Sequence, residues 1–283
     1  MGPLGAHGDN TMQRRILIVI SGLVIILAVF VVFLAKNSVN NPPAPAPCAS
    51  LQRAQEFLNA RYNPSLGLLN EAPVAAPKKY WLANDNALAA HAFYRVGDTE
   101  MSDSLERSLE RYGYSTNGLI EVVWGETVSF PPHVASSVIL TKVGDAEIWQ
   151  EFHLEGPRFE DWAEYADLGF LGALNEYAQG NPAESLRIFA NTLSKFDGTG
   201  FRDKAYNGQY DTYKLAMALY AGATIHAPIP NGNEILDALQ AMQAPDGGYF
   251  TNYTYVIAPK GDENTETTAW ALLAQAAYGC GLE

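Results

Sequence analysis

The sequence predicts an all-α protein in which an N-terminal transmembrane helix precedes an α/α toroid of about five helical hairpins. Residues 16–35 form an unbroken apolar run. After this run, pairs of helical segments recur with a period of about 45 residues, which is typical of stacked hairpins. The second segment of each pair is apolar on nearly all sides, and the first carries charge on one face. We therefore expect an inner and an outer ring of helices.

The apolar run divides the chain into four parts. Twenty uncharged residues at helical rise span the roughly 30 Å hydrocarbon core of a bilayer. Arg14 and Arg15 precede the run, which favours a cytoplasmic N-terminus. A cleaved signal peptide is the alternative, although its apolar core is usually shorter. We expect a cytoplasmic tail (1–15), a transmembrane helix (16–35), a Pro/Ala-rich linker (36–50) and an extracytoplasmic toroid domain (51–283).

The repeats identify the segments expected as inner helices. Several of these segments end at a glycine, the residue that most often terminates a helix. An open right-handed solenoid is the alternative to a closed ring. The expected inner helices are residues 80–96, 133–143, 163–179, 210–221 and 263–279.

The two cysteines lie at opposite ends of the predicted domain. The ends of a closed ring meet, so we expect a disulfide between Cys48 and Cys280. Such a bond would persist outside the cell. Two unrelated free thiols are the alternative. The triplet that begins at Asn252 is a candidate glycosylation site.

A polar residue recurs about a dozen positions before the glycine that ends each inner segment. Because all inner helices of a toroid begin at the same end of the ring, we expect these residues to meet at one mouth. Ordinary capping of helix N-termini by polar residues is the alternative explanation. The residues are Asp85, His133, Asp167, Asp211 and Glu266.

The polar mouth suggests a site for carbohydrate. We expect Asp85, Asp211 and Glu266 to be catalytic, because opposed carboxyl groups can serve as general acid and base in glycosidic cleavage. Flat aromatic faces stack on sugar rings, and polar side chains bind their hydroxyl groups. The expected substrate-binding residues are Trp81, Asn84, Asn86, His133, Trp162, Asp167, Tyr210, Tyr213 and Asn264.

Two C-terminal stretches resemble the repeat of prenyltransferase and terpene-cyclase toroids. They are residues 239–250 (LQAMQAPDGGYF) and 267–273 (TTAWALL). The resemblance implies an α/α toroid. The Asp-x-Asp-Asp acid motif of the cyclases and the Cys-Gly-Glu-Gln thioester of complement-type toroids do not occur in the sequence. Residues 81–86 (WLANDN) more faintly resemble the inner-helix starts of six-hairpin glycosidases, which implies a carbohydrate-binding mouth.

Together these observations predict a membrane-anchored extracytoplasmic domain that binds or hydrolyses glycans. The formal net charge of −13 argues against nucleic-acid partners. The histidines show no metal-ligand spacing, and we expect neither a metal nor a cofactor. One alternative is a non-catalytic interaction module of an envelope complex. A second alternative is a toroid that binds isoprenoids or other lipids.

Overall fold

The computed structural model describes residues 47–72 and 80–280. All of these residues belong to one compact unit, which begins at Pro45. The predicted tail and transmembrane helix, and nearly all of the predicted linker, lie outside the described residues. Within the described residues, no helix is long and apolar enough to cross a membrane.

The prediction of an all-α toroid is wrong. In the described part of the chain, nine α-helices are accompanied by three small sheets, and the helices do not close into a barrel. The helices are α2 (Pro47–Ala60), α3 (Ala83–Arg95), α4 (Thr99–Arg111), α5 (Ile120–Val123), α6 (Ala166–Ala178), α7 (Pro182–Leu193), α8 (Thr212–Thr224), α9 (Gly232–Ala241) and α10 (Thr265–Ala274). The sheets are β1 (Tyr62–Asn63) with β2 (Leu68–Leu69); β3 (Trp81–Leu82) with β4 (Ser136–Val143) and β5 (Ala146–Phe152); and β6 (Tyr210–Asp211) with β7 (Tyr249–Tyr253) and β8 (Pro259–Asn264).

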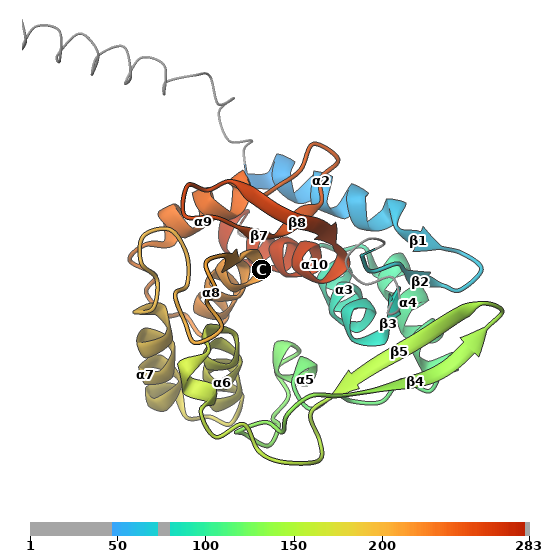
Figure 1. Ribbon diagram of the computed structural model, residues 1–283, viewed down its shortest axis with the longest axis horizontal. Coiled ribbons are helices and arrows are strands. Elements are labelled where there is room, and N and C mark those ends of the chain that lie inside the picture. The colour runs from blue at the N-terminus through green and yellow to red at the C-terminus, as the bar shows by residue number, and fades with distance from the viewer. Residues whose placement is uncertain (1–46, 73–79, 281–283) are drawn as a thin grey trace, which may run out of the picture. The chain divides into compact units, whose positions relative to one another are not determined.

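Four pairs of packed helices form most of the unit. Helices α3, α6, α8 and α10 form an inner arc, and α4, α7, α9 and α2 pack against their outer sides (Figure 1). The inner helices bury most of their residues; in α10 all residues except Glu266 are buried. The outer helices bury a single stripe, as α7 does with Ser185, Ile188, Phe189 and Thr192. This contrast is expected for a covered layer of helices and a solvent-facing one.

The inner arc is interrupted by a β-hairpin. The segment 133–143, predicted as an inner helix, instead contains strand β4. Its β-branched residues Val138, Ile139 and Thr141 pack well on a pleated surface and lose side-chain freedom in a helix. Strand β5 pairs antiparallel with β4 and parallel with β3. Only the short α5 packs between α3 and α6 (Figure 1).

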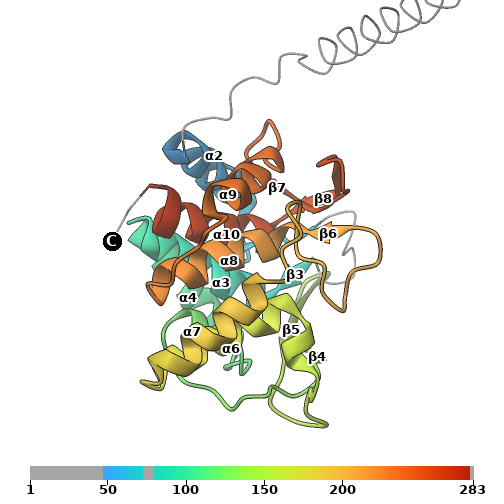
Figure 2. The ribbon, with the colours of Figure 1, turned by 90° about the vertical axis from the view of Figure 1, so that its left-hand side faces the viewer.

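The strands gather at one end of the helices (Figure 2). Strands β3, β6 and β8 lead directly into α3, α8 and α10. The 3₁₀ turn Trp162–Glu164 similarly precedes α6. The first turns of the four inner helices therefore lie at the same end of the unit.

The two cysteines lie next to each other. Both are free thiols, with Cys48 exposed and Cys280 partly buried. Burial raises the pKa of the Cys280 thiol to about 12, and a hydrogen bond with Cys48 contributes to the shift. The start and the end of the unit thus meet, and the disulfide between these residues stays a prediction.

The Gly-Gly turn after α9 brings the chain close to α2. Gly247 has φ +101°, a left-handed conformation that glycine adopts without steric cost. A Cβ atom at this position would lie 2.1 Å from the backbone carbonyl oxygen of Arg53 in α2. The turn therefore needs glycine both for its conformation and for the close approach.

Gly247→Ala is expected to lower the free energy of unfolding by at least about 2 kcal/mol, because backbone strain adds to a clash with a backbone atom. Gly208 is the matched control: its φ is +103°, and open space surrounds the position of its absent Cβ. Gly208→Ala should therefore cost only the strain, about 1 kcal/mol. Urea denaturation measures both variants, and equal losses would contradict the clash with α2.

Candidate functional site

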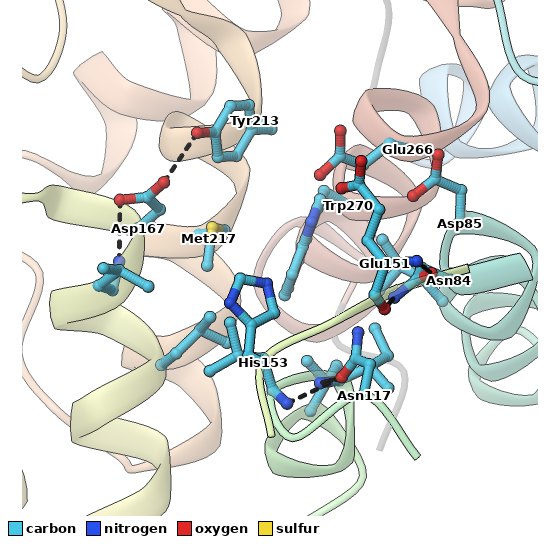
Figure 3. A pocket seen from close by; sticks show the side chains of 16 residues that line it. Asn84, Asp85, Asn117, Glu151, His153, Asp167, Tyr213, Met217, Glu266 and Trp270 are labelled. Atoms are coloured by element: carbon cyan, nitrogen blue, oxygen red, sulfur yellow. Dashed lines mark hydrogen bonds between the residues drawn. The ribbon is translucent and has the colours of Figure 1, made fainter. Parts of the chain in front are cut away.

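A cavity of about 220 Å³ lies at the end of the unit where the inner helices begin (Figure 3). Side chains of α3, α6, α8 and α10 reach it, together with the segment around α5 and the end of β5. The lining residues are Asn84, Asp85, Leu88, Asn117, Leu119, Ile120, Val123, Glu151, His153, Asp167, Leu168, Leu171, Tyr213, Met217, Glu266 and Trp270.

One wall of the cavity is acidic. Asp85 in the first turn of α3, Glu266 in the first turn of α10 and Glu151 of β5 gather there (Figure 3). Burial raises the pKa of Asp85 well above its ordinary value, and the carboxylates of Glu71 and Glu266 raise it further. Burial likewise raises the pKa of Glu266 to about 8, with contributions from Glu71, Glu151 and Asp167.

Glu71 extends this cluster behind the wall. It is only 4% exposed, and burial raises the pKa of its carboxyl group despite a hydrogen bond with Asp85. Carboxyl groups held this close cannot all be ionised, so they share protons and titrate as a group. Near neutral pH the wall therefore carries at least one proton that it can donate.

The opposite wall pairs a carboxylate with a phenol. Asp167, in the first turn of α6, accepts a hydrogen bond of 2.9 Å from the hydroxyl group of Tyr213 in α8. Burial and then the charge of Asp167 raise the pKa of Tyr213 well above its ordinary value. Tyr213 therefore remains a donor, and its hydrogen bond orients the Asp167 carboxylate.

The hairpin β4–β5 is fastened to α3 by one asparagine. The side chain of Asn84 donates to the backbone carbonyl of Glu151 (2.6 Å) and accepts from its backbone N–H (2.8 Å). Two residues further on, His153 also reaches the cavity, because alternate residues of an extended segment share a face. The Nδ1 atom of His153 lies 2.9 Å from the backbone carbonyl of His133.

The remaining surface of the cavity is apolar. The indole of Trp270 and the side chain of Met217 contribute to it (Figure 3), and α5 adds Ile120 and Val123. A flat indole beside polar groups suits a ring with an apolar face and hydroxyl edges.

The structure brings five of the predicted site residues into this cavity: Asn84, Asp85, Asp167, Tyr213 and Glu266. Asp211, the third predicted catalytic residue, does not line it. Its carboxylate forms an ion pair with Lys214 (2.8 Å) and accepts a hydrogen bond from Asn252 (2.8 Å). The candidate glycosylation nitrogen of Asn252 is thus in use, and its modification stays a prediction.

Other predicted binding residues have contacts outside the cavity. Asn86 donates to and accepts from the backbone of Leu69, and Asn264 caps α10 by accepting from the N–H of Thr267. The hydroxyl group of Tyr210 donates to Asp197 (2.6 Å).

The last three predicted binding residues also lie outside the cavity lining. Trp81 is buried in a small apolar cluster of its own with Leu68 and Ile148. Trp162 packs edge-on against Phe130. The ring nitrogen Nδ1 of His133 lies 2.6 Å from the carbonyl oxygen of Gly156.

Five residues at or behind the cavity wall were not predicted from the sequence: Glu71, Asn117, Glu151, His153 and Trp270. Glu151 and His153 lie between two segments that were predicted to be inner helices, 133–143 and 163–179. The two residues are two positions apart, which places both side chains on one face of a strand. This spacing could have identified them as neighbours in one site. Trp270 lies inside the stretch that resembles the toroid repeat.

The described part of the chain contains no group of three or more His, Cys, Asp or Glu side chains arranged to hold a metal ion. Comparisons with protein-family models, with curated proteins and with solved structures found no match.

A buried lysine follows the cavity residue Tyr213 in α8 and pairs with two aspartates. Lys214 of α8 forms ion pairs with Asp203 (2.7 Å) and Asp211 (2.8 Å), and its side chain is 1% exposed. Burial lowers the pKa of Lys214, but the charges of Asp167 and Asp211 outweigh this effect and leave it raised. Asp203 in turn accepts from the first N–H of α6, at Ala166 (2.7 Å).

Lys214→Met is expected to lower the free energy of unfolding by about 3–5 kcal/mol, because it leaves the fully buried Asp203 unpaired. Lys204 is the control, since it pairs with Asp161 and Glu164 at the surface. Lys204→Met should cost much less, because a solvent-exposed ion pair contributes little to stability. Chemical denaturation at pH 7 compares the two variants, and a small loss at Lys214 would disprove a supporting role.

The raised pKa of Glu266 makes stability depend on pH. Between its ordinary value of 4.5 and about 8, the folded state binds more protons than the unfolded state. Stability should therefore fall as pH rises through this window, by up to about 1.4 kcal/mol per pH unit for one group. Glu266→Gln keeps the neutral shape and should flatten the fall. Denaturant midpoints from pH 5 to 9 test this, with the exposed Glu155→Gln as control. A slope that is unchanged in Glu266→Gln would contradict the assignment.

Proposed function

We propose that this cavity binds glycans and hydrolyses a glycosidic bond by general acid–base catalysis. The observation that carries the proposal is the pairing of a proton-bearing carboxyl wall with a carboxylate across the cavity. Two carboxyl groups in different protonation states, on two sides of a substrate, are what glycosidic cleavage requires.

Glu266 is assigned as the general acid. With a pKa of about 8 it is protonated near neutral pH, and it donates its proton to the glycosidic oxygen as the bond to the anomeric carbon breaks. The electron pair of that bond stays on the departing oxygen. Glu71 raises the pKa of Glu266, and Asp85 belongs to the same group of carboxyls that share protons. Asp85 and Glu71 therefore act through Glu266 and are positioning residues in this scheme.

Asp167 is assigned as the general base. It takes a proton from a water molecule whose oxygen attacks the anomeric carbon from the side opposite to Glu266. Tyr213 holds the Asp167 carboxylate in place through its 2.9 Å hydrogen bond. Because water attacks the anomeric carbon in a single displacement in this scheme, the product should have an inverted anomeric configuration.

The cavity surface supports a carbohydrate over a lipid. An apolar chain would displace water from the four carboxyl groups of the lining and offer them no hydrogen bonds in its place, at a cost in free energy. The indole of Trp270 offers a stacking face for a sugar ring, and the amide group of Asn117 lies in the same lining. An anchor at residues 16–35, with this unit outside the membrane, would place the activity at the cell surface.

A second candidate function is an interaction module. Exposed apolar side chains on the two hairpins favour it: Val138 and Ile139 on β4, and Tyr255 and Val256 between β7 and β8. An interaction module requires no catalysis in the cavity. The cleavage experiment described next therefore distinguishes it from a glycan hydrolase.

The purified protein is expected to cleave members of a panel of neutral and amino-bearing oligosaccharides. Glu266→Gln and Asp167→Asn should each lower kcat at least about 100-fold, because each removes one half of the acid–base pair. Product analysis by mass spectrometry and NMR measures the activity, and Glu155→Gln controls for surface charge. If no oligosaccharide is cleaved or raises the melting temperature, the proposal is wrong and the interaction module takes its place.

A further inference from the structure

A second cavity, of about 280 Å³, adjoins the first. The segment that precedes α5 lies between them: Asn117 lines the first cavity, and Thr116 and Gly118 line the second. His153 lines both cavities, and its backbone N–H donates to the carbonyl oxygen of Asn117 (2.7 Å). Figure 3 shows His153 and Asn117 from the side of the first cavity. The two cavities therefore share a wall, and His153 can be reached from each of them.

Two histidines in the lining of the second cavity have the same tautomer. The Nδ1 atom of His153 lies 2.9 Å from the carbonyl oxygen of His133, and the Nδ1 atom of His133 lies 2.6 Å from that of Gly156. A carbonyl oxygen only accepts, so each Nδ1 atom carries the hydrogen. In a neutral imidazole the Nε2 atom is then an acceptor. Among the described residues, no donor bonds to either Nε2 atom.

Glu121 supplies a third acceptor to the same lining. The residue is only 3% exposed, and its Oε1 atom accepts from the backbone N–H of Asn117 (2.8 Å). Its Oε2 atom is buried and has no hydrogen-bond partner in the part of the chain that the structure describes. Folded proteins leave few buried polar atoms in this state, because each one costs free energy. The missing donor is therefore expected from a molecule that enters the cavity.

The three acceptors indicate the chemistry of that molecule. A ligand with several hydroxyl groups can donate to all of them. An anionic ligand would be repelled by Glu121 and Glu126, which both line the cavity. Two imidazoles and a carboxylate could also bind a metal ion, but within the described residues these side chains are not arranged to hold one. A sugar unit, whose edge is a row of hydroxyl groups, fits best.

The volumes of the two cavities indicate one sugar unit in each. About 220 Å³ and about 280 Å³ are both less than the roughly 300–1,000 Å³ of pockets that enclose a whole drug-sized molecule. Taken together, the two volumes fall within that range. A ligand of two linked units could therefore fill both cavities, with its linkage passing His153.

We propose that the second cavity is the subsite for the sugar unit next to the one in the first cavity. Hydroxyl groups of this unit donate to the Oε2 atom of Glu121 and to the Nε2 atoms of His133 and His153. This inference rests on the proposed glycan hydrolysis and names residues that would bind a second unit of the substrate. The smallest ligand that occupies the whole site is then a disaccharide.

The test measures how much a second sugar unit adds to binding by the cleavage-deficient Asp167→Asn variant of the whole protein. The probes are glucose, galactose, mannose and N-acetylglucosamine, each as the monomer and as its 1,4-linked dimers. Isothermal titration calorimetry at pH 7 is expected to show, for at least one of these sugars, a dimer that binds at least about tenfold more tightly than its monomer.

Two further substitutions, each added to Asp167→Asn, locate the second unit. Glu121→Gln keeps the Oε1 acceptor and replaces Oε2 by an amide nitrogen, and His133→Asn keeps a donor in place of Nδ1 and removes Nε2. Each should lower the ratio of dimer to monomer affinity at least about fivefold, because it removes an acceptor. Glu155→Gln, exposed and outside both linings, should leave the ratio unchanged. If Glu121→Gln does not fold, His133→Asn decides the outcome.

Long-range ¹H–¹⁵N NMR spectra test the two tautomers directly. Without sugar, His133 and His153 should each carry a hydrogen on Nδ1 and none on Nε2. The dimer should shift the Nε2 resonance of His133, and the monomer should leave that resonance in place. A hydrogen on Nε2 of both rings, or a His133 resonance that the dimer does not move, would overturn the assignment.

The remaining outcomes separate this inference from the proposed function. Equal binding of monomers and dimers would overturn the second subsite and leave glycan binding standing. A preference for the dimer that survives both substitutions would place the second unit elsewhere, and it would also overturn the inference. Failure of every monomer and every dimer to bind would overturn both the subsite and the proposed function.

Discussion

The inner helices α3, α6, α8 and α10 are apolar around nearly their whole circumference, and the arrangement of the unit depends on this property. A helix of this kind has to be covered on all sides, which the outer helices and the neighbouring inner helices achieve. Polar residues are then best placed near the helix ends. Asp85, Asp167 and Glu266 occupy first turns at the same end, so the packing that builds the core also delivers the carboxyl groups to one cavity.

Two opposing effects act on these carboxyl groups, and their magnitudes decide the outcome. The N-terminus of a helix favours an ionised carboxylate by roughly 0.3–1 kcal/mol. Burial of a charge without a cationic partner costs several kcal/mol. The second effect wins at Asp85 and Glu266, whose pKa values are raised. Asp211 occupies the equivalent position before α8, but Lys214 one turn later provides the missing cation. The same sequence pattern therefore produced a proton-bearing acid in two helices and an ion pair in a third.

The parts of the site that could be predicted from the sequence are those set by the repeat. Alignment of the inner segments on their terminal glycines found Asp85, Asp167 and Glu266, because helix ends in successive hairpins fall at one end of the unit. At residues 133–143 the repeat period predicted a helix, which is wrong because the local β-branched residues favour a strand. The error also hid Glu151, since it lies on the strand that pairs with this segment.

The hairpin β4–β5 adds to the cavity side chains that a uniform ring of helices would not supply, Glu151 and His153. On the proposed function, Glu266 and Asp167 lie in the first turns of rigid helices, which is where proton transfer needs accurate placement. Glu151 lies on a hairpin that joins α3 through β3 and the two hydrogen bonds of Asn84. A change at Asn84 would therefore displace Glu151, which contributes to the raised pKa of Glu266. On the proposed function, the position of the hairpin is accordingly coupled to the protonation of the general acid.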